Sequence, residues 1–194
     1  MLQKITTLTL TLLIIISCSK QQEQQKPVEM KTTDWKKEVQ QTLKQFGHRN
    51  WIVIADSAYP EQSNPAIKTI TVDADQLEVI NYVNELIEKA SHVDANIFID
   101  QEMAFVSEED AKGIESYRNN LNTLLEGKPS KTMLHEDIIR ELDASAKLFN
   151  VLIIKTDLAI PYTSVFFQLE CGYWNAEAEK NMRLKLNKAI LSAN

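Results

Sequence analysis

The chain has 194 residues, of which 44% are hydrophobic, and this is enough for one domain with a substantial core. A long disordered protein is therefore excluded. The net charge of -6 at pH 7 argues against a nucleic-acid partner, because such a protein needs positive surface charge to displace counterions from phosphates.

The first 17 residues have the composition of a signal peptide. Lys4 gives a positive start, and an apolar stretch runs from Leu8 to Ile16. This stretch is about half of the roughly 20 apolar residues that a spanning helix needs, which favours export and cleavage over permanent insertion. Ser17 and Cys18 resemble a bacterial lipobox, in which the cysteine is acylated. A plain signal peptide that happens to end near a cysteine is the alternative.

We therefore expect a lipoprotein signal peptide over residues 1–17, a flexible tether over 18–33 and a domain over 34–194. The protein would be exported to the cell envelope, held on a bacterial membrane through a lipid at Cys18, and would face the periplasm. The tether is rich in Gln and Lys and has almost nothing to bury. Cys171 is then the one remaining cysteine and has no intramolecular partner.

A helix is predicted first, followed by a buried strand. Trp35, Val39, Leu43 and Phe46 share one helical face, and Gly47 is expected to end the helix in a left-handed conformation. The run "WIVIA" at 51–55 is apolar and β-branched, as expected for a strand covered on both faces of a parallel sheet. Asp56 would follow at the carboxyl end of this strand, where ligands gather in open α/β sheets.

Strands and helices then alternate to the end of the chain. Strands are expected at 66–72, 95–100, 150–155 and 164–169, and helices at 75–90, 107–126, 136–148 and from 175 onward. Ser107 and Asp110 form a capping box for the helix at 107–126. The last helix places Met182, Leu186 and Ile190 where they can cover an edge of the domain or contact another subunit. The alternation predicts an α/β fold with a mostly parallel central sheet flanked by helices.

Common catalytic motifs are absent from the sequence. Four glycines cannot build a dinucleotide-binding GxGxxG or a P-loop, and there is no GxSxG, HExxH or paired CxxC. A metal site made from His48, His92, His135 and Asp56 stays open as a weaker alternative. His92 lies between a predicted helix and strand and is interpreted as a surface-loop residue.

Three segments in order resemble the ribose pyranase and fucose mutarotase family: "GHRNWIVIADSAYP" at 47–60, "MLHEDI" at 133–138 and "KTDLAIPYTSV" at 155–165. The spacing from His48 to Asp56 fits the family motif without a gap. An "EM" pair at Glu102 and Met103 adds a weaker match. The resemblance covers about residues 36–170 and implies a three-layer α/β fold.

This resemblance implies a sugar mutarotase or pyranase, which opens and closes the ring of a ribose-like or fucose-like monosaccharide. It implies no cofactor and no metal. His48 would be the catalytic acid–base group, since histidine exchanges protons near neutral pH. The implied substrate contacts are Asp56, His135, Tyr162, Thr163 and Ser164. The family also implies a homo-oligomer with its sites at subunit contacts.

The sequence departs from the family pattern at two positions near its C-terminal motif. Ser164 stands where the family usually has Asn, and Asp157 replaces a glycine after Thr156. A serine makes fewer hydrogen bonds than an amide, so substrate preference or activity is expected to differ. Two alternatives therefore stay open, namely a non-catalytic monosaccharide-binding lipoprotein and a structural envelope protein on the same scaffold.

Overall fold

A computed structural model describes residues 34–192. Its strands are β1 (Trp51–Ala55), β2 (Ile67–Thr71), β3 (Val93–Asp100), β4 (Ser130–Met133), β5 (Val151–Lys155) and β6 (Val165–Cys171). Its helices are α1 (Trp35–Gln45), α2 (Gln76–Lys89), the 3₁₀ helix η1 (Gln101–Phe105), α3 (Ile114–Leu124), α4 (His135–Ser145) and α5 (Ala176–Ser192). The predicted signal peptide, tether and Cys18 lie outside the described residues. No helix in the described part of the chain is long and apolar enough to cross a membrane.

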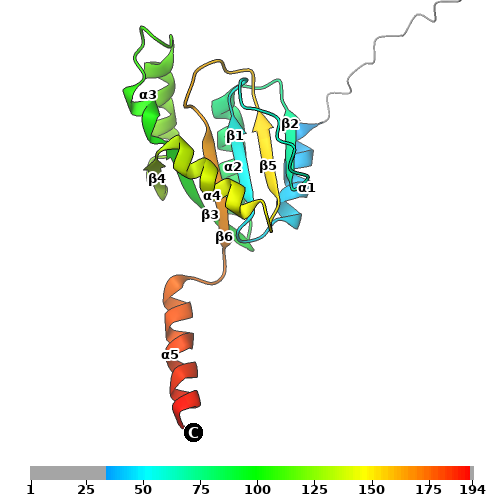
Figure 1. The fold of residues 1–194 in the computed structure, drawn as a ribbon, viewed down its shortest axis with the longest axis vertical. Coiled ribbons are helices and arrows are strands. Elements are labelled where there is room, and N and C mark those ends of the chain that lie inside the picture. Colours follow the sequence, from blue (N-terminus) through cyan, green and yellow to red (C-terminus); the bar gives the residue numbers. More distant parts are fainter. Residues whose placement is uncertain (1–33, 193–194) are drawn as a thin grey trace, which may run out of the picture. The chain divides into compact units, whose positions relative to one another are not determined.

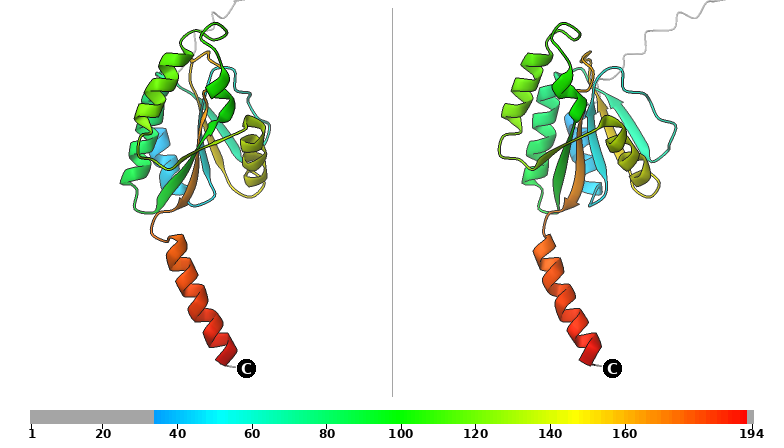
Figure 2. Two further views of the ribbon diagram at one scale, coloured as in Figure 1. Left: turned by 90° about the vertical axis from the view of Figure 1, so that its left-hand side faces the viewer. Right: turned by 60° about the vertical axis from the view of Figure 1, so that its left-hand side comes forward.

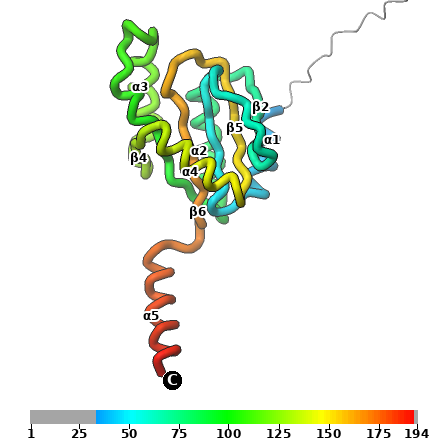
Figure 3. The backbone as a smooth tube through the Cα atoms, in the orientation of Figure 1, coloured from blue at the N-terminus to red at the C-terminus, as the bar shows by residue number. Residues whose placement is uncertain are grey.

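The six strands form one sheet in the order β2-β5-β1-β6-β3-β4 (Figure 1). Trp51 of β1 pairs in parallel with Val151 of β5 and in antiparallel with Gln168 of β6. Strand β6 runs against both of its neighbours, whereas the other five strands share one direction. The backbone trace in Figure 3 shows β1 and β5 side by side, although they are far apart in sequence. We call the sheet edge at which these five strands end the carboxyl edge, and the opposite edge the amino edge.

Helices cover both faces of the sheet. Figure 2 shows α2 and α3 on one side and α4 on the other. On the first side, α1, α2 and α3 bury Val39, Val83 and Leu121 against Ile52 and other strand residues. On the second side, Ile138 and Leu142 of α4 pack with alternate residues of the same strands. All five residues of β1 are buried, as expected for a strand with both faces covered. The predicted three-layer α/β fold is confirmed.

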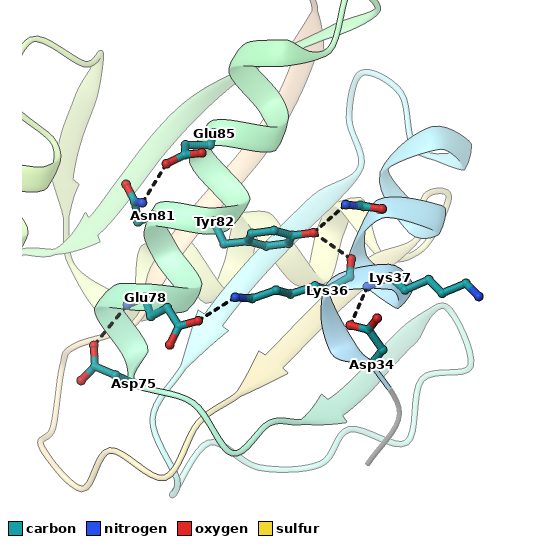
Figure 4. Close-up of polar contacts among 9 residues, drawn as sticks. Asp34, Lys36, Lys37, Asp75, Glu78, Asn81, Tyr82 and Glu85 are labelled. Atoms are coloured by element: carbon teal, nitrogen blue, oxygen red, sulfur yellow. Dashed lines mark hydrogen bonds and ion pairs between the residues drawn. The ribbon is translucent and has the colours of Figure 1, made fainter. Parts of the chain in front are cut away.

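The contact between α1 and α2 is polar at its surface. Side chains of Asp34 and Asp75 cap the two helices by accepting backbone N–H groups (Figure 4). Lys36 Nζ lies 2.8 Å from Glu78 Oε1, and the Tyr82 hydroxyl donates to the Lys36 carbonyl at 3.1 Å. These contacts fix two helices that the sequence pattern predicts to within two residues.

Two local predictions about turns are wrong. The left-handed residue after α1 is Arg49, with φ of 76°, and Gly47 has no positive φ. Ser107 and Asp110 do bond to each other, but they close a turn, and α3 begins at Ile114 after left-handed Gly113. The backbone N–H of Gly113 is taken by the Glu108 side chain, which holds this turn apart from the helix.

Three further differences concern elements near the ends of strands. The sequence pattern did not predict the 3₁₀ helix η1 or the short strand β4, both of which have few residues with a clear period. Helix α5 buries no residue in the described chain, so of the two alternatives for this helix it does not cover an edge of the domain, and contact with another subunit stays a prediction. Cys171 is a free thiol of intermediate exposure.

Candidate functional site

A cavity of about 570 Å³ lies at the carboxyl edge, beside the ends of β1 and β4. This volume is within the usual range for small-molecule sites, roughly 300–1,000 Å³. Polar atoms enter it from the loop after β1, from the start of α4 and from the loop before β6. The cavity is lined by Asp56, Ser57, Ala58, Tyr59, Pro60, Gln62, His135, Glu136, Ile139, Ala159, Ile160, Pro161 and Tyr162.

The structure brings together three of the predicted site residues. Asp56, His135 and Tyr162 line the cavity although they come from three separate segments. Thr163 and Ser164 are instead buried at the start of β6 and line no part of it. As direct substrate contacts these two residues stay predictions. Thr163 supports the loop that carries Tyr162 through a hydrogen bond to the Ile160 carbonyl.

His48 lies at the amino edge, away from the cavity. It is exposed, three positions before Trp51 begins β1, whereas Asp56 follows the end of β1. At about 3.3 Å per residue, the five residues of β1 separate the two edges by roughly 15 Å. One chain therefore does not bring the predicted catalytic histidine to the cavity.

His135 is held by carboxylates at both its ring and its backbone. Its Nδ1 lies 3.0 Å from Oδ1 of Asp100, the last residue of β3. Its backbone N–H donates to both carboxylate oxygens of Glu102, at 3.1 and 3.0 Å. The N-cap of α4, Leu134, has no side chain for this purpose, so Glu102 caps the helix in its place.

Electrostatics around His135 favour its charged form. The hydrogen bond to Asp100 raises the pKa of His135 above its ordinary value, and Glu136 and Glu102 act in the same direction. Burial raises the pKa of Asp100, since desolvation disfavours an isolated carboxylate, and the bond to His135 partly offsets this. These contacts favour the protonated imidazole, which is in a position to release its proton to a bound ligand.

Tyr162 projects from a strained loop. Its φ of 58° is unusual for a residue with a side chain. The next residue secures the loop, because the Thr163 hydroxyl donates to the Ile160 carbonyl at 2.7 Å. The Thr163 carbonyl accepts from Gln76 Nε2 at 2.6 Å and from the Tyr117 hydroxyl at 2.8 Å. This buried network holds Tyr162 at the cavity in a backbone conformation that would otherwise be unfavourable.

Tyr59 is a further polar group at the cavity. Burial raises its pKa to about 12, so its hydroxyl stays protonated over the physiological range. Its hydroxyl oxygen is buried and has no hydrogen-bond partner among the described residues.

Within residues 34–192, no group of three His, Cys, Asp or Glu side chains is placed to hold a metal ion. The metal alternative built on His48, His92, His135 and Asp56 therefore has no geometric basis in a single described chain. The ring of His92 contacts the Leu43 carbonyl at 3.0 Å, far from the cavity lining.

Sequence reasoning missed Asp100, Tyr59, Gln76 and Tyr117. Asp100 had a signal, because it ends the apolar strand "ANIFID" as Asp56 follows "WIVIA". Parallel strands bring their carboxyl ends to one edge, so this signal was equivalent to the one used for Asp56. Gln76 and Tyr117 lie on helices, and only the packing of those helices against the sheet brings them under the loop.

The model of the RbsD / FucU transport protein family matches residues 30–172 of the chain. The chain belongs to this family. The match spans all three sequence segments on which the resemblance rests, as well as Asp100 and the two helices that support the cavity. No curated protein sequence matches the chain.

Solved structures with a similar fold include Bacillus subtilis RbsD complexed with D-ribose, at 17% identity and a TM-score of 0.48, covering 69% of this chain and 91% of that one. They also include a fucose mutarotase in complex with L-fucose from Streptococcus pneumoniae, at 24% identity and a TM-score of 0.45, covering 67% and 89%. FucU from Bifidobacterium longum has 15% identity and a TM-score of 0.46, covering 69% and 92%. Assignment to the family depends on the family model and not on these superpositions.

Proposed function

We propose that this protein is a sugar mutarotase or pyranase, which interconverts the anomers or ring forms of a ribose-like or fucose-like monosaccharide. The single observation that carries the proposal is a cavity, in a member of this family, that presents His135, Asp56 and Tyr162 together. The cavity volume of about 570 Å³ leaves room for a monosaccharide and for a second protein group.

The reaction consists of proton transfers. A base takes the proton of the anomeric hydroxyl while an acid protonates the ring oxygen, and the bond between C1 and that oxygen breaks. Closure on the other face, or through another hydroxyl, reverses these steps. Such transfers need no cofactor, and positioned acid–base groups accelerate them by about 10²–10⁴-fold. Asp56 and Tyr162 would bind the remaining sugar hydroxyls.

His48 would join this site from a second copy of the chain, in a homo-oligomer. It is exposed at the amino edge, and the cavity lies at the carboxyl edge, so a head-to-tail contact between copies would bring the two together. Large apolar side chains are exposed near both edges, with Leu148 at 81% just before β5 and Phe105 at 82% at the end of η1, which follows β3. Their burial between copies would stabilise such a contact.

A non-catalytic monosaccharide-binding lipoprotein is the second candidate. One observation favours it, namely that Ser164 stands at the position usually held by Asn and is fully buried, without lining the cavity. A sugar hydroxyl would then lose a hydrogen-bond partner, and precise placement of the anomeric carbon would suffer. Saturable binding without ring opening is what this candidate predicts.

We also propose that Cys18 is lipidated and that the protein acts in the bacterial cell envelope. The lipobox-like sequence before Cys18 supports this, together with a tether over residues 18–33 that would separate the domain from the bilayer. Metabolic labelling with a radioactive fatty acid tests the proposal. Label in the wild type and its loss in Cys18→Ala is the expected result, and equal labelling of both would contradict it.

The function is tested by exchange NMR on the anomeric protons of ribose and fucose, using residues 19–194. We expect faster exchange with the wild type and its loss in His48→Ala and in His135→Ala. His92→Ala is the matched control, because His92 lies outside the cavity and should leave exchange unchanged. Line broadening of the sugar without faster exchange would favour the binding lipoprotein. No effect on any sugar would contradict both candidates and favour a structural role.

A further inference from the structure

The most unusual group near the cavity is the pair formed by Asp100 and His135. The side chain of Asp100 is completely buried, whereas that of His135 is 28% exposed and faces the cavity. Oδ1 of Asp100 bonds to Nδ1 of His135 at 3.0 Å, and Oδ2 is buried with no partner among the described residues. His135 is therefore the one hydrogen-bond partner of this carboxylate in the described chain.

Other contacts restrict the imidazole ring to one orientation. Glu102 fixes the backbone N–H of His135. The Tyr162 ring lies edge-on with centroids 5.9 Å apart and an interplanar angle of 81°, and Phe166 lies at 6.4 Å and 61°. With Nδ1 engaged by Asp100, the atom left to meet a ligand is Nε2, which has no partner within residues 34–192.

We propose that Asp100 is a positioning residue for the mutarotase reaction, because it fixes the His135 ring with Nδ1–H toward β3 and thereby makes Nε2 the proton-exchanging atom. This rests on the proposed function. In the opening step, His135 Nε2–H protonates the ring oxygen as the C1–oxygen bond breaks, and a base takes the proton of the anomeric hydroxyl to leave a carbonyl. Closure returns both protons. Asp100 keeps its own protonation state throughout, so protons balance over the cycle.

The charges around His135 agree with this role. The groups that face it are Asp100 from β3, Glu102 from η1, Glu136 from its own helix, the Tyr162 ring from the loop before β6, and Asp56 across the cavity. None of these carries a positive charge. The hydrogen bond to Asp100 is the largest cause that raises the pKa of His135. When the imidazole is neutral, the same bond selects the tautomer with a lone pair on Nε2.

The test follows His135 directly by nitrogen-15 NMR, since the chain has three histidines and His135→Gln identifies the resonances of this one. We expect the Nδ1–H tautomer in the wild type and a pKa above the ordinary value. In Asp100→Asn, the pKa should fall toward the ordinary value. In parallel, sugar exchange near neutral pH should slow by about 10-fold to 100-fold, and its pH profile should shift to lower pH with the His135 titration.

Asp137→Asn is the matched control. It removes a carboxylate from the same helical turn, but Asp137 pairs with Arg140 at 2.8 Å on the exposed side of α4. We expect it to leave the His135 titration and sugar exchange unchanged. A purely structural role for Asp100 would lower stability without moving the pH profile.

Two results would overturn the proposal. The first is an Nε2–H tautomer for neutral His135 in the wild type, which needs no variant and does not depend on how Asp100→Asn folds. The second is an Asp100→Asn protein whose His135 titration or exchange profile is unchanged. If the wild type does not accelerate exchange of any sugar, the proposed function fails by that result alone, and the tautomer measurement still decides whether Asp100 orients the ring.

Discussion

The two edges of the sheet are built in different ways, although β1 reaches both. At the carboxyl edge, the polar side chains of Asp100, Thr156 and Thr163 are buried. Their hydrogen-bond partners are the His135 ring, the Gln76 side chain and the Ile160 carbonyl, respectively. At the amino edge, the turn that carries His48 is held by backbone bonds, as where Arg49 N–H donates to the Leu169 carbonyl at 2.7 Å, and by exposed side chains, as where Asn50 Nδ2 donates to the Asn150 carbonyl at 3.0 Å. The carboxyl edge therefore has buried side-chain support, whereas the amino edge presents His48 on an exposed turn.

This difference shows how a compact sequence motif can be divided in space. His48 and Asp56 are close in "GHRNWIVIAD", yet an extended strand between them places them at opposite edges. A motif of this kind specifies one site only if another copy of the chain supplies the missing half.

The strongest test of the two-edge comparison is complementation between His48→Ala and His135→Ala. Each variant alone should lose about 10²–10⁴-fold of sugar exchange, because each lacks one acid–base group. Co-expressed in equal amounts, the two should regain activity in about a quarter of their sites if each site combines the cavity of one copy with His48 of another. Exchange NMR on the purified mixture measures this.

The matched control is His48→Ala co-expressed with a second tagged copy of itself, which should stay inactive. If mixed oligomers are shown to form and activity is not regained, the idea that one site combines the two edges of different copies is wrong. Either both histidines then act from the same copy, or His48 takes no part in the reaction.

At the amino edge, stability should fall if a side chain is added where two backbone segments lie close together. A Cβ on Gly172 would lie 2.7 Å from the carbonyl oxygen of Val93, at the start of β3. Gly172→Ala should therefore lower the free energy of unfolding by about 1–3 kcal/mol, as measured by urea denaturation. Gly47→Ala is the control, with no atom within 4 Å of its Cβ and no positive φ. Equal stability of the two variants would contradict the close approach of β3 and β6.

A side-chain-supported carboxyl edge should be sensitive to the loss of one hydroxyl. Tyr117→Phe removes the donor to the Thr163 carbonyl and the acceptor of the Gln76 amide. We expect a loss of about 0.5–1.5 kcal/mol in unfolding free energy, together with weaker sugar binding through the Tyr162 loop. Tyr82→Phe, on the surface between α1 and α2, is the control. It should lower the unfolding free energy by less and leave sugar affinity unchanged, as measured by titration calorimetry. Unchanged sugar affinity in Tyr117→Phe would show that this buried network does not influence sugar binding.

The smallest expected effect is on how stability depends on pH. Because the pKa of folded His135 is raised above 6.5, its protonation stabilises the folded state. This contribution is present below the unfolded pKa and is lost as pH rises through the folded pKa. The raised pKa of buried Asp100 acts in the same direction. The Tm of the wild type minus that of Asp100→Asn should therefore decrease from about pH 5 to about pH 8. A Tm difference that is constant or rises over this pH range would contradict a stabilising interaction between protonated His135 and Asp100.

Periodic elements were predictable, and turns were not. The strand 51–55 matches β1 because it is a continuous apolar run, and the helix 75–90 matches α2 because its apolar residues repeat with helical spacing over four turns. The left-handed position at Arg49 and the turn before Ile114 depend on contacts with Leu169 and Glu108, which are not adjacent in sequence. Asp56, His135 and Tyr162 were predicted for the site and do share the cavity, whereas the supporting Gln76, Tyr117 and Asp100 were missed.

The sequence by itself determined the order of the longer strands and helices, the direction of most of the sheet and the family, because these depend on local patterns of apolar residues and on short motifs. Only the tertiary structure decided which motif residues meet. It joined His135 to Asp100 across 35 positions and separated His48 from Asp56 across eight, since hydrogen bonding and packing act through space and an extended strand keeps its two ends apart.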